Sequence, residues 1–189
     1  GKQEVNLKTT LCVKSGGGDK EAAARGPSKL TRLTWQKKFI GSLTKELADG
    51  SNTPSVRLLA AVVMKNTIAG RSTVSFETDL FQNQADVWIG LDPEYRGHVK
   101  QAVVSALDTD DNNIRRAVAL CVASIAAIEI PRGEWQDLIS LMVGTADNEN
   151  INVRLSSLQT LGFLADELES RYFNDQQKSF IIQAIVKNI

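Results

Sequence analysis

Histidine and cysteine are scarce in this sequence, and their scarcity excludes most metal and redox sites. His98 is the single histidine, and Cys12 and Cys121 are the two cysteines among 189 residues. A structural zinc site takes four ligands of these types, and a disulfide framework needs at least four cysteines. We therefore expect no metal, no cofactor and no such framework. Cys121 lies in an apolar stretch, where we expect a small core residue.

An excess of charge of one sign is also missing. Lys+Arg and Asp+Glu both number 22, so the formal net charge is zero. Such a balance lacks the basic field with which proteins usually bind nucleic acid. No apolar run reaches the roughly 18 residues of a membrane-spanning helix. We expect no nucleic-acid binding and no membrane insertion.

Catalytic signatures are absent as well. His98 lies within a helical window, where an exposed or half-buried residue is expected in place of a general base. The glycine-rich stretch 16–20 lacks the spacing and the Lys-Ser/Thr pair of a phosphate-binding loop. The acid pairs at 110–111 and 166–167 lie at helix ends, where turns and helix starts normally carry them. We expect no enzyme.

What the sequence does contain is a repeat. Arg57, Arg115 and Arg154 each follow a β-branched residue, and each precedes an apolar helical stretch. Arg154 follows Arg115 by 39 positions, close to the ~40–47 residues of one HEAT-type helix pair. Arg115 follows Arg57 by 58 positions, so an extra element is expected between them.

Helical windows fill the remaining stretches. Window 35–47 places apolar residues four apart, and window 93–107 begins with proline at a natural first helical position. Window 134–142 repeats the pattern, and window 174–189 opens with Asn174 and Gln177 at the spacing of a helix cap. Window 117–130 is apolar over most of its circumference, as in a helix sandwiched within a stack.

We therefore predict an all-α protein, a right-handed α-solenoid of HEAT repeats with about four and a half helix pairs. The expected array over 1–189 comprises an atypical first repeat (1–33), a second repeat (34–69), an inserted loop or helix (70–91), a third repeat (92–130), a fourth repeat (131–169) and the first helix of a truncated fifth repeat (170–189).

Aspartates upstream of the repeated arginines suggest a structural ladder. The expected pairs are Asp49 with Arg57, Asp108 with Arg115, and Asp147 with Arg154. An arginine near the start of a second helix would reach the carboxylate of an inter-helix turn with charge-assisted bonds. Three solvated surface arginines are the alternative, which the recurrence in register disfavours.

Three stretches carry the most specific motifs. They are 56–66 (VRLLAAVVMKN), 88–100 (WIGLDPEYRGHVK) and 125–138 (IAAIEIPRGEWQDL). With 158–163 (LQTLGF), they resemble the amino-terminal repeats of the karyopherin-β family of nuclear transport receptors, the importin-β type. The resemblance runs from about Phe39 to the end of the sequence. Gln136 departs from it, because the family usually has proline at that helix start.

The resemblance implies a receptor that binds the GTP-bound small GTPase Ran through the second helices of its repeats. In the full-length protein it would carry cargo through the nuclear pore, and it would be found in cytoplasm, nucleus and the nuclear envelope. Importin-α or cargo would bind only the full-length protein. The Ran-facing residues that it implies are Lys65, Asn66, Asp166 and Glu167.

FG-repeat nucleoporins would meet a partial site at Ile182 and Val186. For all these positions the alternative roles, a helix cap, solvated side chains or plain core, stay open. The alternative function is a generic HEAT-repeat scaffold subunit of a phosphatase or chromosome complex, without dependence on Ran. The Ile-Glu-Ile-Pro…Trp stretch and the Lys65-Asn66 helix end favour the receptor.

Overall fold

The computed structural model describes residues 29–69 and 88–187, and these ranges contain α-helices and no strands. The helices are α1 (Lys29–Ala48), α2 (Pro54–Ile68), α4 (Pro93–Ser105), α5 (Asn112–Glu129), α6 (Leu138–Thr145), α7 (Ile151–Glu167) and α8 (Asp175–Lys187), with the short 3-10 helices η2 (Ile130–Arg132) and η3 (Ser170–Tyr172). The all-α prediction is confirmed.

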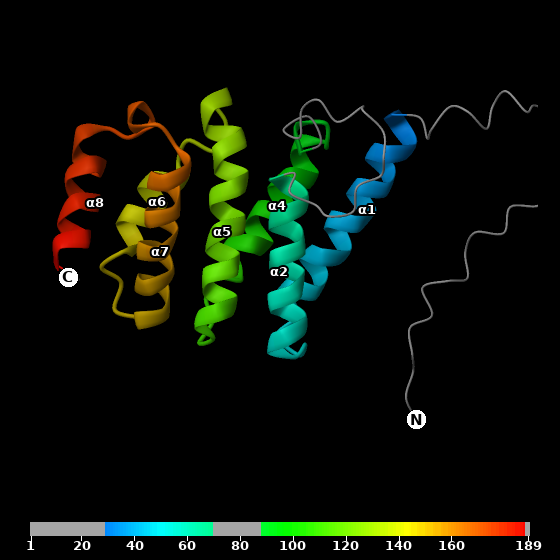
Figure 1. The fold of residues 1–189 in the computed structure, drawn as a ribbon, viewed down its shortest axis with the longest axis horizontal. Helices are drawn as coiled ribbons and strands as arrows, with labels where there is room; N and C mark the ends of the chain where they lie inside the picture. The colour runs from blue at the N-terminus through cyan, green and yellow to red at the C-terminus, as the bar shows by residue number, and fades with distance from the viewer. Residues whose placement is uncertain (1–28, 70–87, 188–189) are drawn as a thin grey trace, which may run out of the picture.

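The helices pack in antiparallel pairs that stack into two layers. Helices α1, α4, α6 and α8 form one layer, and α2, α5 and α7 form the other, side by side (Figure 1). Each pair packs internally, α1 on α2, α4 on α5 and α6 on α7, and α5 packs against both α2 and α7. This is the architecture of an α-solenoid. Because α2, α5 and α7 run in the same direction, their carboxyl-terminal ends lie along one edge (Figure 1).

Polar residues at the expected positions start the helices. Asp92 accepts hydrogen bonds from the main-chain N–H groups of Glu94 and Tyr95, and Pro93 is the first helical residue of α4. Asn174 and Gln177 bond each other reciprocally at the start of α8, from each main-chain N–H to the other side-chain oxygen at 2.9 and 2.8 Å. This is a capping box, so the predicted cap is confirmed.

Helix α5 forms the centre of the core. Its buried set includes Val118, Cys121, Val122 and Ile125, all 0% exposed. Burial raises the pKa of the Cys121 thiol to about 12, and its sulfur donates to the carbonyl of Ala61 on α2 at 3.0 Å. A helix contacted on both flanks and from behind must be apolar nearly all round, as the sequence predicted.

The prediction of a helix beginning at Glu134 is wrong. Helix α6 begins at Leu138, and residues 134–137 form a turn instead. Gly133 and Trp135 both have positive φ, 81° and 51°, a conformation that no right-handed helix contains. Glutamate, tryptophan and glutamine are all tolerated in helices, so their propensities do not indicate this turn. The pattern of apolar residues does not reveal a strained tryptophan backbone either.

Two of the predicted segments lie largely outside the described residues. These are the atypical first repeat (1–33) and the inserted element (70–91). Helix α1 begins at Lys29, five positions before the predicted start of the second repeat at residue 34. Within the described ranges the pairs α1/α2, α4/α5 and α6/α7 succeed one another along the chain, and the bounds of the repeats stay a prediction.

Candidate protein-binding face

The second helices of the pairs leave one face of their layer open, and this face is unusually apolar. We call it the open face: the outward stripes of α2, α5 and α7, opposite the layer formed by α1, α4 and α6 (Figure 1). Large exposed hydrophobic side chains on it are Val56, Leu59 and Val62 of α2 and Ile151 and Leu155 of α7. Leu59 is 62% and Ile151 57% exposed. Large exposed apolar side chains gathered in two stripes on one face are typical of protein interaction sites.

Helix α2 brings Asn66 onto the open face. Asn66 follows Leu59 and Val62 at spacings of seven and four, so the three side chains share one stripe of the helix. Lys65 lies about 100° around the helix from Asn66 and is half-buried. The two residues that sequence analysis grouped together therefore point in different directions.

Helix α7 brings Asp166 onto the same face. Ile151, Leu155, Gly162 and Asp166 are all exposed and follow the helical repeat along one stripe. Glu167 ends the helix and is exposed as well. Two acids in the last turn are unfavourable to the helix dipole, by about 0.3–1 kcal/mol each at a surface. Carboxylates at that position are thus not explained by the stability of α7.

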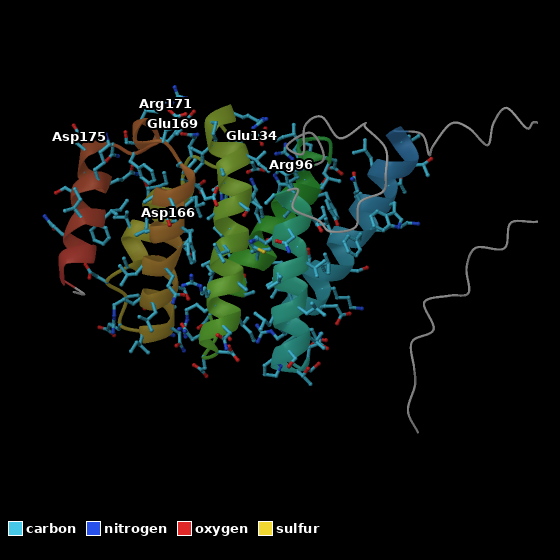
Figure 2. All side chains as sticks on the ribbon, in the orientation of Figure 1. Arg96, Glu134, Asp166, Glu169, Arg171 and Asp175 are labelled. Carbon is cyan, nitrogen blue, oxygen red and sulfur yellow. The ribbon has the colours of Figure 1, made fainter. Side chains whose placement is uncertain are left out.

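More acids lie beyond the end of α7. Figure 2 shows Asp166, Glu169 and Asp175 along the end of the layer nearest α8, with Arg171 among them. Arg171 pairs with Glu169 at 3.0 Å, with both side chains about two-thirds exposed. Helix α5 lies between α2 and α7, so Lys65 and Asn66 share an edge with Asp166 and Glu167 without forming one cluster with them (Figure 1).

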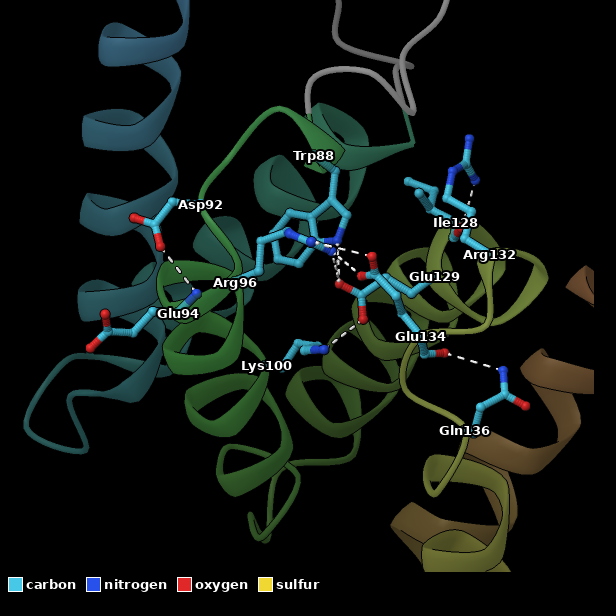
Figure 3. A network of polar contacts seen from close by, with 10 residues as sticks. All are labelled: Trp88, Asp92, Glu94, Arg96, Lys100, Ile128, Glu129, Arg132, Glu134 and Gln136. Carbon is cyan, nitrogen blue, oxygen red and sulfur yellow. Dashed lines mark hydrogen bonds and ion pairs between the residues drawn. The ribbon is translucent and has the colours of Figure 1, made fainter.

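Below this edge a buried polar network joins three successive segments of chain (Figure 3). Glu129, at the end of α5, is fully buried. Its carboxylate accepts hydrogen bonds from Trp88 Nε1 at 2.9 Å, Arg96 Nη1 at 2.7 Å and Lys100 Nζ at 2.6 Å. Three donors satisfy a charge that would otherwise be expensive to bury.

The network continues into the turn that precedes α6. Arg96 also pairs with Glu134, and the hydrogen bond from its guanidinium holds the pKa of that carboxyl below its ordinary value. Lys100 lies 5.0 Å from the ring centroid of Trp135, within range of a cation–π interaction. The positive φ of Trp135 therefore has a local reason, because the turn carries both Glu134 and Trp135 back towards α4.

Sequence analysis missed this network. The one available signal was Glu129 itself, a carboxylate within the apolar run Ile125–Ile130, and it was interpreted only as part of a family motif. A charged residue at a core position of a helix requires partners. Nothing in the helical period indicates that the partners are Arg96 and Lys100, about 30 positions away.

The arginines of the predicted ladder link turn and helix, but not through aspartates. Each guanidinium donates to a main-chain carbonyl: Arg57 Nε to Leu47 at 3.1 Å, Arg115 Nη2 to Thr109 at 2.7 Å and Arg154 Nη1 to Asn148 at 2.7 Å. In the part of the chain that the structure describes, no ion pair joins these arginines to Asp49, Asp108 or Asp147. The carbonyls after a helix lack helical partners, and the arginines supply them.

The aspartates have other roles. Asp49 accepts hydrogen bonds from the main-chain N–H and hydroxyl of Ser51, at 2.9 and 2.6 Å, and these bonds lower the pKa of Asp49. Asp108 and Asp147 are exposed. Between repeats, Arg115 instead reaches the side chain of Asn152 on α7 at 3.0 Å. The inter-repeat contact is thus made to an asparagine.

Ile182 and Val186 both lie on α8. The side chain of Ile182 is 61% exposed, and the side chain of Val186 lies outside the described ones. Helix α8 packs against α6, where Gln177 Nε2 donates to the hydroxyl of Ser140 at 3.3 Å. Leu141, the next residue of α6, is also exposed.

His98 is exposed, with its Nε2 3.9 Å from a carboxylate oxygen of Glu94. Among the residues that the structure places, no group of His, Cys, Asp and Glu is arranged to hold a metal ion. No helix within the same residues has the length and apolar character to cross a bilayer.

Comparison with known proteins identifies the family. The family described as "Importin-beta N-terminal domain" matches residues 28–109. Importin subunit beta-1 of Saccharomyces cerevisiae is 31% identical over 133 residues, 69% of this chain and 15% of the relative. Importin subunit beta-1 of Arabidopsis thaliana is 24% identical over 151 residues, 80% of this chain and 17% of the relative. The chain thus spans about a sixth of the length of these relatives.

Solved structures agree. Yeast importin-β (Kap95p) superposes with a TM-score of 0.65 at 30% identity, over 86% of this chain and 20% of the other. Kap95p has also been solved with RanGDP, whose switch loops it induces to adopt the GTP-bound conformation. That structure superposes with a TM-score of 0.60 at 25% identity, over 88% of this chain and 23% of the other. The Kap95:Nup1 complex superposes with a TM-score of 0.63 at 29% identity, over 87% of this chain and 20% of the other. With its stacked helix pairs and the matched amino-terminal domain, the chain belongs to the importin-β family of nuclear transport receptors.

Proposed function

We propose that this chain binds the small GTPase Ran, with preference for its GTP-bound form, through the open face of α2, α5 and α7. The observation that carries the proposal is the exposed apolar surface of this layer, with Leu59 and Val62 on one flank and Ile151 and Leu155 on the other. A similar structure, Kap95p, has been solved with Ran. In a longer protein this binding would release or load cargo during passage through the nuclear pore, between cytoplasm and nucleus.

The preference for one nucleotide state follows from differential binding. A receptor that fits the GTP conformation of the switch loops better shifts Ran towards that conformation, and the coupling is reciprocal. The Kap95p structure, in which RanGDP adopts the GTP-bound switch conformation, supports this order of affinities. Asn66 and Asp166 are proposed contacts because they share the stripes of the apolar residues. Lys65 and Glu167 are proposed because they lie in the last turns of the same two helices.

The test is calorimetric titration of the chain with Ran loaded with GDP or with a non-hydrolysable GTP analogue. We expect the GTP form to bind at least tenfold more tightly. Replacing Lys65 and Asn66 together by alanine should weaken binding without lowering helicity. Lys38→Ala, an exposed change on α1 in the other layer, is the matched control. Absent or equal binding of the two forms would exclude the proposal and favour a generic HEAT-repeat scaffold.

We also propose that the outer surface of α8 contributes to binding of FG-repeat nucleoporins through Ile182 and Val186. The exposure of Ile182 and of neighbouring Leu141 supports an apolar contact, and the similar protein Kap95 has been solved with Nup1. A phenylalanine-glycine peptide titrated by NMR should shift resonances of α6 and α8, and Ile182→Ser should reduce those shifts. Leu30→Ser, also at an exposed position but on α1, is the control. Equal effects of both variants would refute this site.

A further inference from the structure

Arg116 differs from the other arginines whose side chains the structure describes. The others each donate a hydrogen bond to a carbonyl or carboxylate: Arg57, Arg96, Arg115, Arg132, Arg154 and Arg171. Arg116 is exposed and forms no hydrogen bond or ion pair with any residue in the described ranges. Its guanidinium carbon lies 5.2 Å from the ring centroid of Phe163 on α7.

The contact with Phe163 orients Arg116. A guanidinium over an aromatic ring at this distance forms a cation–π interaction, which reduces the number of side-chain conformations. The contact with the ring uses none of the five N–H donors of the guanidinium in a hydrogen bond. Arg116 is therefore a partly immobilised donor whose hydrogen-bonding capacity is not used by the residues that the structure describes.

Arg116 lies between two apolar stripes, and its own exposed stripe on α5 also carries the polar residues Asn112 and Asn113. It follows Asn113 by three positions and precedes Leu120 by four, which places it on the open face of α5. The stripes to either side carry Leu59 of α2 and Leu155 of α7, both exposed. A single oriented cation between two apolar stripes is the arrangement of an interface anchor, since arginines at the centre of apolar contacts are enriched among binding hot spots.

We propose that Arg116 is the specificity-determining anchor of the open face and that it binds a carboxylate of the protein seated there. This rests on the proposed function, in which that protein is the GTPase. A carboxylate matches the guanidinium in charge and offers two acceptors to its planar fork. A nucleic-acid phosphate fits less well, because one cation flanked by leucines lacks the basic field that phosphate backbones require.

The test is titration of Arg116 variants with Ran carrying the GTP analogue. Arg116→Ala should bind roughly tenfold to a hundredfold more weakly, the range for loss of a charge-assisted anchor. Arg116→Lys should recover only part of the affinity because it lacks the fork, and Arg116→Glu should abolish binding. Affinity of the wild type should fall with added salt more steeply than that of Arg116→Ala.

Controls separate the possible failures. Arg116→Met keeps the aliphatic stem over Phe163, so recovery of affinity by this variant would show that the side chain acts by packing and would refute the carboxylate. Lys38→Ala removes one charge from the other layer and should have no effect. If the wild type binds and Arg116→Ala matches Lys38→Ala, the anchor is refuted while the proposed function stands. If the wild type binds neither form of Ran, the anchor and the proposed function are both refuted. Thermal unfolding of each variant confirms that it is folded.

Discussion

Glu129 is the residue on which the polar network of the α4/α5 pair depends. Its fully buried carboxylate is the common acceptor of Trp88, Arg96 and Lys100. We expect Glu129→Ala to reduce the free energy of unfolding by about 3–5 kcal/mol, because the substitution removes the buried acceptor that Trp88, Arg96 and Lys100 share. Glu129→Gln should cost less, since an amide oxygen still accepts from the indole.

Urea unfolding followed by circular dichroism measures this difference. Glu169→Ala provides the matched control, because Glu169 pairs only with Arg171 at a surface where both side chains are about two-thirds exposed. An exposed pair of this kind contributes about 0–1 kcal/mol. A loss for Glu129→Ala no larger than that of the control would show that the three donors find water when the carboxylate is removed.

At the scale of helices, the sequence was sufficient wherever a local rule decides the structure. The reciprocal cap of Asn174 and Gln177 and the proline at the start of α4 depend on residues within four positions of each other. The burial of α5 follows from its composition. Local rules therefore gave the type and order of the described helices.

The same rules failed where a residue's partner is distant in the chain. The turn before α6 has helical propensities, but Arg96 and Lys100 hold Glu134 and Trp135 in a different conformation. The repeated arginines predicted a link between turn and helix, and only the fold reveals that carbonyls are the acceptors. For the candidate site, the helical period places Asn66 on the outward stripe of α2 and Asp166 on that of α7. The contact of Arg116 with Phe163 depends instead on how α5 and α7 pack.

For the whole molecule, the carboxylates that depend on the folded state determine its response to acid. The pKa of Glu134 is lowered from 4.5 by the hydrogen bond from Arg96, and the pKa values of Asp49 and Asp92 are lowered from 3.8 by hydrogen bonds from Ser51 and Tyr95. A carboxyl whose pKa is lower in the folded state stabilises the fold above its unfolded pKa. That stabilisation is lost as the pH falls through the folded value.

We therefore expect the melting temperature to be nearly constant from neutral pH down to about 5 and to fall progressively below about 4.5. Glu134→Gln should lower the melting temperature at neutral pH and flatten the decline in acid. The reason is that the variant has one fewer carboxyl group whose ionised form is favoured by folding. Differential scanning calorimetry of both proteins between pH 3 and pH 7 measures the two curves. Parallel curves, offset by the same amount at every pH, would mean that the Arg96–Glu134 pair acts through packing and not through the charge of the carboxylate.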